Sequence, residues 1–178
     1  MELQTDRLLL RRFRIEDAEQ FASFADDAAY RRHLGPNHPS SAQLVANNVN
    51  ADADREPSWV ILLDGQVVGS IFLGVQQDDG IAELACLLAP AAWGQGIAIE
   101  AGRAVIAHAF TDLALDKIFA RTEAANAKSR RAMEKSGMRQ EAVLASHRRT
   151  ASGDRVDEVI YAVTRDEWRP IGRHPDDS

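Results

Sequence analysis

The chain has 178 residues, of which 45% are hydrophobic and 27% are charged, and its formal net charge at pH 7 is −6. This composition is typical of a globular protein with one hydrophobic core, and the acidic balance argues against nucleic acid as the main partner. The segment MELQTDR lacks the basic start of a signal peptide, and no stretch approaches about 18 uninterrupted apolar residues, so we expect a cytoplasmic protein without a membrane segment.

The spacing of hydrophobic residues divides the chain into strands and helices. In chain order we expect a strand at 7–13, a helix at 15–27, a loop at 34–41 with Ser40 or Ser41 capping a short helix, three strands within 58–89, a helix at 94–113, a strand at 117–122, a helix at 126–137, and strands at 138–149 and 155–164. Asp64-Gly65, a preferred hairpin dipeptide, joins the first two of the three consecutive strands. This order predicts an α/β domain with a mixed sheet rather than a doubly wound parallel sheet.

The segment AAWGQGIAIEAG, residues 91–102, places two glycines where a strand pattern gives way to a helical one. Amide groups at a helix N-terminus attract anions, and glycine lets a phosphate approach the backbone closely. The glycines either serve such a site or only let the chain turn and pack. No Gly-Lys-Ser/Thr follows, as a Walker loop requires, and Ile99 interrupts a dinucleotide fingerprint at its third glycine position. The pyrophosphate of coenzyme A is the third candidate.

Several ordered motifs resemble the GNAT superfamily of N-acetyltransferases, and within it the branch of the ribosomal-protein N-terminal acetyltransferases RimJ and RimL. The matching segments are LQTDRLLLRRFRIEDAEQF, WGQGIAIEA, NAKSRRAMEKSGM and GDRVDEVIYAVTRDEW, and together they span residues 3–168. The chain departs from the superfamily pattern at Trp93, where Gln or Arg is usual, and at Met138, where Phe is usual. The resemblance implies a GNAT fold over residues 1–170, with a C-terminal tail at 171–178. The expected sheet is mixed and mostly antiparallel, with about six to seven strands and helices on both faces.

The resemblance also implies a binding site for acetyl-CoA. The backbone of Cys86, Leu87 and Leu88 would pair with the pantetheine arm as a strand would, and an amide near Leu87 or Leu88 would polarise the thioester carbonyl. The pyrophosphate would lie on the turn formed by Trp93, Gly94, Gln95, Gly96, Ile97 and Ala98. Asn126 matches the asparagine that bonds the pantetheine arm, and asparagine is also a favourable helix N-cap. The basic run at 128–131 either forms a solvated helix face or, through Arg131, meets the adenosine 3′-phosphate.

Three residues are candidates for the chemistry of acetyl transfer, which requires a neutral amine and a protonated thiolate. Ser129 is the candidate acid because Met133 stands where many superfamily members carry a proton-donating tyrosine. Glu83 and Glu123 are candidate bases, while relay through water and the absence of a protein base remain open alternatives. The non-catalytic alternatives are that Ser129 is only a serine on a helix surface and that Glu83 and Glu123 are solvated glutamates on a sheet face.

The sequence therefore predicts an acetyl-CoA-dependent N-acetyltransferase that acts on a protein N-terminus or a small-molecule amine by direct transfer in a ternary complex. A non-catalytic acyl-CoA-binding module and a dinucleotide-binding oxidoreductase are the alternatives. The resemblance also suggests a homodimer. The five histidines show no metal-ligand spacing, so no metal is expected.

Overall fold

The computed structural model describes residues 2–25, 39–51, 56–150 and 152–169. Its strands are β1 (Leu3–Gln4), β2 (Leu8–Arg11), β3 (Ser58–Leu63), β4 (Gln66–Gln76), β5 (Ile81–Leu88), β6 (Lys117–Glu123), β7 (Arg139–Arg149) and β8 (Arg155–Thr164). Its helices are α1 (Asp17–Ala25), α3 (Ser41–Val49), α4 (Ile97–Thr111) and α5 (Ala127–Lys135), with short 3₁₀ turns at Gln77–Asp79 and Pro90–Ala92. The predicted order of elements is confirmed.

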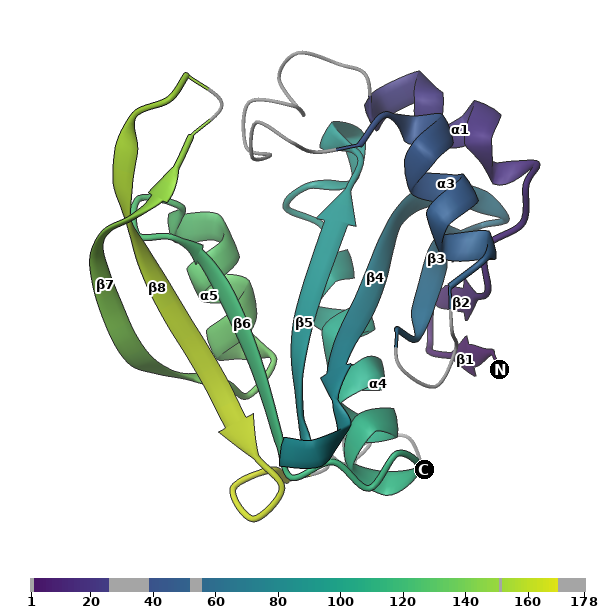
Figure 1. Cartoon of the computed structure of the whole chain (residues 1–178). Coiled ribbons are helices and arrows are strands. Elements are labelled where there is room, and N and C mark those ends of the chain that lie inside the picture. Colours follow the sequence, from purple (N-terminus) through teal and green to yellow (C-terminus); the bar gives the residue numbers. More distant parts are fainter. Residues whose placement is uncertain (1, 26–38, 52–55, 151, 170–178) are drawn as a thin grey trace.

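All eight strands form one sheet in the order β1-β2-β3-β4-β5-β6-β8-β7. Every neighbouring pair is antiparallel except β5 and β6, which run parallel. Helices α1 and α3 cover one face of this sheet, and α4 and α5 lie on the other (Figure 1). The predicted mixed, mostly antiparallel sheet with helices on both faces is therefore confirmed. Its eighth strand is β1, a two-residue strand that lies before the predicted start of the first strand at residue 7.

The predicted turns and caps follow from local side-chain chemistry. Asp64 and Gly65 both adopt positive φ angles, 50° and 77°, which is the conformation of a type I′ hairpin. Ser40, rather than Ser41, caps α3: its hydroxyl accepts a hydrogen bond from the Gln43 amide, and the Gln43 side chain accepts one from the Ser40 amide. The predicted loop at 34–41 lies mostly outside the described residues, as does the tail at 171–178.

The core lies between the sheet and its helices. Its largest fully buried side chains include those of Tyr161, Phe21, Ile61, Ile71 and Ile106. His108 of α4 is also buried, with its ring perpendicular to that of Trp59 and its Nδ1 2.7 Å from Asp112 Oδ2. This histidine therefore has a packing role. Among the described helices, none is long and apolar enough to cross a membrane.

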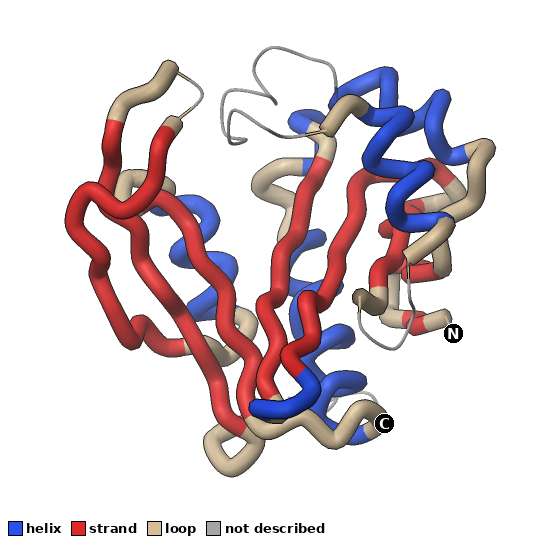
Figure 2. Tube along the Cα trace, viewed as in Figure 1, coloured by secondary structure: helices blue, strands red, loops and turns tan. Residues whose placement is uncertain are grey.

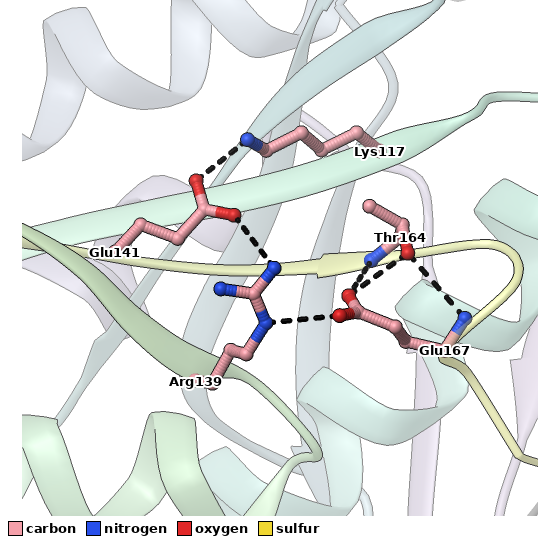
Figure 3. Close-up of polar contacts among 5 residues, drawn as sticks. All are labelled: Lys117, Arg139, Glu141, Thr164 and Glu167. Atoms are coloured by element: carbon pink, nitrogen blue, oxygen red, sulfur yellow. Dashed lines mark hydrogen bonds and ion pairs between the residues drawn. The ribbon is translucent and has the colours of Figure 1, made fainter.

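A polar network ties β6, β7 and the end of β8 together (Figure 3). Lys117 Nζ lies 2.6 Å from Glu141, and Arg139 joins Glu141 to Glu167 at 3.4 and 2.9 Å. Glu167 in turn accepts a hydrogen bond from the Thr164 hydroxyl at 2.8 Å. These groups are partly exposed, so each pair contributes little to stability by itself. The network holds the three strands together at the end of the sheet where β5 still pairs with β6.

Candidate active site

Strands β5 and β6 diverge in the middle of the sheet. Their parallel pairing runs only from Ile81 to Glu83, opposite Lys117 to Phe119. Beyond that point β5 stays paired with β4 as far as Leu88, and β6 stays paired with β8 as far as Glu123. Figures 1 and 2 show the two strands close at one end and apart at the other. No described strand pairs with the β6-facing edge of residues 84–88, so this edge is available to an extended ligand.

The glycine turn between β5 and α4 presents a row of free amides. Gly94 and Gly96 have φ angles of 78° and 79°, a conformation in which a side chain is unfavourable. Gly96 is the N-cap of α4, and no side chain caps this helix. Within the described part of the chain, none of the five N–H groups from Gly94 to Ala98 donates a hydrogen bond. These donors at the positive end of the helix dipole form a cradle for an anion.

The hairpin formed by β1 and β2 supports this glycine turn through Arg7 and Thr5. Arg7 donates a hydrogen bond to the Gln95 carbonyl at 3.1 Å and forms an ion pair of 2.7 Å with Glu100 in the first turn of α4. Thr5 donates a further hydrogen bond of 2.6 Å to Glu100. Burial alone raises the pKa of Glu100, but the hydrogen bonds from Thr5 and Arg7 outweigh it and hold the pKa below its ordinary value. Thr5 and Arg7 lie within the opening motif LQTDRLLLRRF, but no local pattern indicates their contact with Glu100, which is more than 90 positions away.

Trp93 contacts both the end of β5 and the start of α5. Its indole N–H donates a hydrogen bond of 2.9 Å to the carbonyl of Leu88, the last residue of β5. The ammonium group of Lys128, in the first turn of α5, lies 5.8 Å from the centre of the Trp93 ring. This distance is typical of a cation–π contact. The start of α5 therefore lies beside the turn that precedes α4.

Asn126 is the N-cap of α5, and its side-chain oxygen accepts a hydrogen bond of 3.1 Å from the Ser129 amide. This is the helix-capping role that the sequence allowed. The side-chain Nδ2 of Asn126 makes no hydrogen bond to any described residue. The hydroxyl of Ser129, which is half-buried, likewise has no hydrogen-bond partner among the described residues. Both side chains thus have donors available beside the diverging strands.

The basic run of α5 contains side chains with different surroundings. Arg130 donates hydrogen bonds to the Tyr161 hydroxyl, the Ala124 carbonyl and Gln140, so it holds α5 on the sheet. Arg131, the predicted phosphate ligand, is exposed. Met133 packs against the core. The structure therefore leaves Arg131, but not Arg130, available to an anion.

The side chains at the end of β5 have a packing role, and only their backbone is assigned to the pantetheine arm. Leu87 and Leu88 pack against the core, and Cys86 joins them. Removal of the Cys86 thiol from water raises its pKa to about 12, so this cysteine is a thiol rather than a thiolate at neutral pH. Ser70 of β4, directly opposite Leu87, has the one described side-chain oxygen that is fully buried without a hydrogen bond. Nothing in the sequence pattern marked this serine.

The two candidate bases lie on the two arms and are both paired with arginines. Glu83, the last residue of β5 that pairs with β6, accepts two hydrogen bonds from the Arg121 guanidinium, one of them 2.7 Å long. This contact raises the pKa of Arg121. Glu123 ends β6, and its carboxylate lies 3.9 Å from Arg148 of β7. Each glutamate would therefore have to leave its arginine and contact the acceptor amine before it could accept a proton.

Comparison with known proteins identifies the fold and the family. The model of the acetyltransferase (GNAT) domain matches residues 7–139. The uncharacterized N-acetyltransferase YnaD of Bacillus subtilis (strain 168) is 27% identical over 173 residues, which cover 94% of this chain and 99% of that protein.

Two solved structures have the same arrangement of strands and helices. A GNAT-family acetyltransferase from Bacillus anthracis superposes with a TM-score of 0.83 and 25% identity, covering 93% of this chain and 99% of that one. Mycobacterium smegmatis RimJ, in complex with CoA-disulfide, superposes with a TM-score of 0.81 and 23% identity, covering 94% of this chain and 87% of that one. The resemblance inferred from the motifs is thus confirmed, and the chain belongs to the GNAT family of acetyltransferases.

Proposed function

We propose that this acetyltransferase uses acetyl-CoA and transfers the acetyl group to a primary amine, either a protein N-terminus or a small-molecule amine, by direct transfer in a ternary complex. The observation that carries the proposal is the combination of a free edge on β5 with five free amides in the turn that follows it. A pantetheine arm and a pyrophosphate are joined in coenzyme A in that same order. The family assignment argues against the dinucleotide-binding oxidoreductase.

The residues of the chain fit the groups of acetyl-CoA. A side chain added at Gly94 would meet no atom within 4 Å, so there is open space in front of this part of the turn. The backbone N–H groups of residues 94–98 would donate hydrogen bonds to the pyrophosphate. The backbone of Cys86, Leu87 and Leu88 would form hydrogen bonds with the pantetheine arm. The side-chain Nδ2 of Asn126 would donate a hydrogen bond to that arm, and Arg131 would form an ion pair with the 3′-phosphate. A β5 amide near Leu87 or Leu88 would polarise the thioester carbonyl.

Two measurements test the proposal. Calorimetry should show that the purified protein binds acetyl-CoA in preference to NAD or NADP. Release of free thiol from acetyl-CoA should then depend on an added amine, in a panel of peptides with free N-termini, polyamines, amino acids and aminoglycosides. Binding without thiol release across the panel would favour the non-catalytic acyl-CoA-binding module instead.

Gly96→Glu is expected to weaken acetyl-CoA binding at least tenfold, or by about 1.4 kcal/mol. A side chain at this position is strained by the φ angle of 79°, and its Cβ would lie 3.6 Å from the Arg7 guanidinium, so it would disturb the contact that supports the turn and add a negative charge beside the amides. Gly65→Glu is the matched control, because Gly65 has nearly the same φ angle, 77°, in a remote hairpin with no atom near its missing side chain. Gln95→Glu adds the charge without backbone strain and should weaken binding in the same direction. Calorimetric affinities equal to that of the wild type in folded Gly96→Glu and Gln95→Glu would remove this turn as the site.

The homodimer and the cytoplasmic location are predictions from the sequence. We expect light scattering at micromolar concentration to give twice the mass of one chain, which is 19.6 kDa. A mass equal to one chain at the same concentration would contradict the dimer.

A further inference from the structure

Strand β7 contains a bulge that brings two successive side chains to one face of the sheet. Leu144 pairs with Glu158 and Arg148 pairs with Val156, so three residues of β7 lie opposite a single residue of β8. In a regular strand, successive side chains point to opposite faces. Here His147 Nε2 lies 3.7 Å from Glu158, and Arg148 Nε lies 3.9 Å from Glu123. Bulges re-aim side chains in this way and are frequent beside active sites.

Specific contacts hold the bulge in place. Ser146 adopts a φ angle of 51°, which is uncommon for a residue other than glycine. Its amide donates a hydrogen bond of 2.8 Å to the Asp157 side chain, and its carbonyl accepts one of 2.9 Å from Arg155. Backbone conformations of this kind persist only where neighbouring contacts determine them. These contacts hold the backbone beside His147, while the His147 side chain is 54% exposed and accessible to a substrate.

The carboxylate of Glu158 is the unusual group in this cluster. Its side chain is only 5% exposed, and no described residue donates a hydrogen bond to it. A buried carboxylate requires a cation or hydrogen-bond donors to compensate for the loss of water. The imidazole of His147 lies 3.7 Å from the Glu158 carboxylate and would become a cation on accepting a proton. Glu158 would stabilise that imidazolium, as a carboxylate does for a catalytic histidine.

The cluster adjoins the elements assigned to acetyl transfer. Glu158 lies opposite Glu123 in the β6–β8 pair. The backbone carbonyl of Glu123 accepts a hydrogen bond of 2.9 Å from the backbone N–H of Asn126, at the start of α5. Two residues before Glu123, Arg121 reaches across to Glu83 of β5. The cluster therefore lies along β6 and β8, between the contact with β5 and the start of α5.

We propose that His147, stabilised by Glu158, accepts the proton of the acceptor's ammonium group; this inference rests on the proposed function. Loss of that proton leaves a neutral amine, whose lone pair forms the C–N bond to the acetyl carbon as the C–S bond breaks. Of the three ammonium hydrogens, one passes through His147 to water, one ends on the CoA thiol, and one stays on the amide. The charges balance with the net release of one proton.

The charged groups around His147 are balanced in sign, three carboxylates against three guanidinium groups, so Glu158 rather than the wider field would stabilise the imidazolium. The groups facing the pair are Glu123 and Arg121 of β6, Asp157 and Arg155 of β8, and Arg148 of β7. Arg148 contacts Glu123, while Asp157 and Arg155 are engaged by the bulge. Only the neutral imidazole has a free lone pair, so His147 must hold no extra proton when the acceptor binds.

The test uses full-length protein and an amine that the wild type acetylates in the panel described above. We expect His147→Ala to lower kcat at pH 7 by about tenfold, which is modest for a general base, with acetyl-CoA affinity unchanged. Millimolar imidazole should restore part of the lost rate, and the loss should shrink at high pH, where more of the amine is already neutral. Glu158→Gln should lower kcat in the same direction. Arg149→Gln, which removes an exposed cation two residues farther along β7, should leave kcat unchanged.

A merely structural role for His147 would not produce rescue by imidazole. Unchanged kcat in His147→Ala between pH 6 and pH 9, or a loss that imidazole does not reverse at any pH, would overturn the inference while leaving the proposed function intact. Failure of the wild type to bind acetyl-CoA would instead overturn the proposed function, and this inference with it.

Discussion

Replacement of Asp17 by asparagine is expected to lower the free energy of unfolding by about 3–5 kcal/mol. Asp17 and Arg11 form a pair with two hydrogen bonds, of 2.7 and 2.9 Å, and their side chains are only 3% and 10% exposed. Asp17 also accepts a hydrogen bond of 2.8 Å from the Arg14 amide at the start of α1. Loss of the carboxylate leaves the Arg11 guanidinium buried without its counter-ion, which is more costly than losing both charges.

Urea denaturation followed by circular dichroism measures this effect. Glu16→Gln is the matched control, because it removes a carboxylate from the neighbouring exposed residue and should change the unfolding free energy by less than about 0.5 kcal/mol. The double variant Arg11→Met with Asp17→Leu should recover part of the stability lost in Asp17→Asn. Equal midpoints for Asp17→Asn and Glu16→Gln would show that the buried pair has no special contribution.

The stabilisation by Asp17 should also depend on pH. Burial by itself raises the pKa of Asp17, but the hydrogen bonds from Arg11 and Arg14 outweigh it and leave the pKa below its ordinary value. Stability from such a group is fully present above the unfolded-state pKa, about 3.9, and is lost as the pH falls through the folded-state value. The difference between wild type and Asp17→Asn should therefore be constant above about pH 5 and narrow below about pH 4.

Ser129→Ala is expected to lower kcat by roughly 10²-fold, with acetyl-CoA affinity nearly unchanged, because Ser129 is the candidate acid that would protonate the departing thiolate. The Ser129 amide is held by the Asn126 side chain, and the hydroxyl makes no hydrogen bond to a described residue. Met133, which occupies the place of the usual tyrosine, packs against the core and carries no proton to donate. Steady-state kinetics with the acceptor found in the amine panel measure kcat, and calorimetry measures the affinity.

Two further variants separate catalysis from structure. Asn126→Ala should weaken acetyl-CoA binding and, since Asn126 caps α5, lower the unfolding free energy by about 1 kcal/mol. Ser23→Ala removes an exposed hydroxyl from α1 and should leave kcat unchanged. If Ser129→Ala retains full kcat while the chemical step limits the rate, the serine is only a helix residue. The thiolate then takes its proton from water or from the amine.

The family resemblance could be recognised from the sequence because its motifs depend on residues close together in the chain. Gly94 and Gly96 were marked by their place where a strand pattern gives way to a helical one, and Asn126 and Ser129 by their spacing of three residues in a family segment. Glu83 was named from its alternation with apolar residues and Glu123 from its place at the end of the next strand, but their arginine partners were not predicted. Arg121 and Arg148 carry no motif, since an arginine on a strand is equally common on any solvated sheet face.

The sequence by itself determined the order of the elements, the Asp64-Gly65 hairpin, the caps of α3 and α5 and the glycine turn, because each depends on side chains within a few residues of one another. Only the tertiary structure decided how these parts meet. Arg7 supports the turn through Glu100, 93 positions later, and Arg121 reaches Glu83 across 38 positions. The pairing of His147 with Glu158 depends on a bulge that shifts the register of β7 against β8. Such contacts depend on the register of strands distant in the chain, which local hydrophobic patterns do not specify.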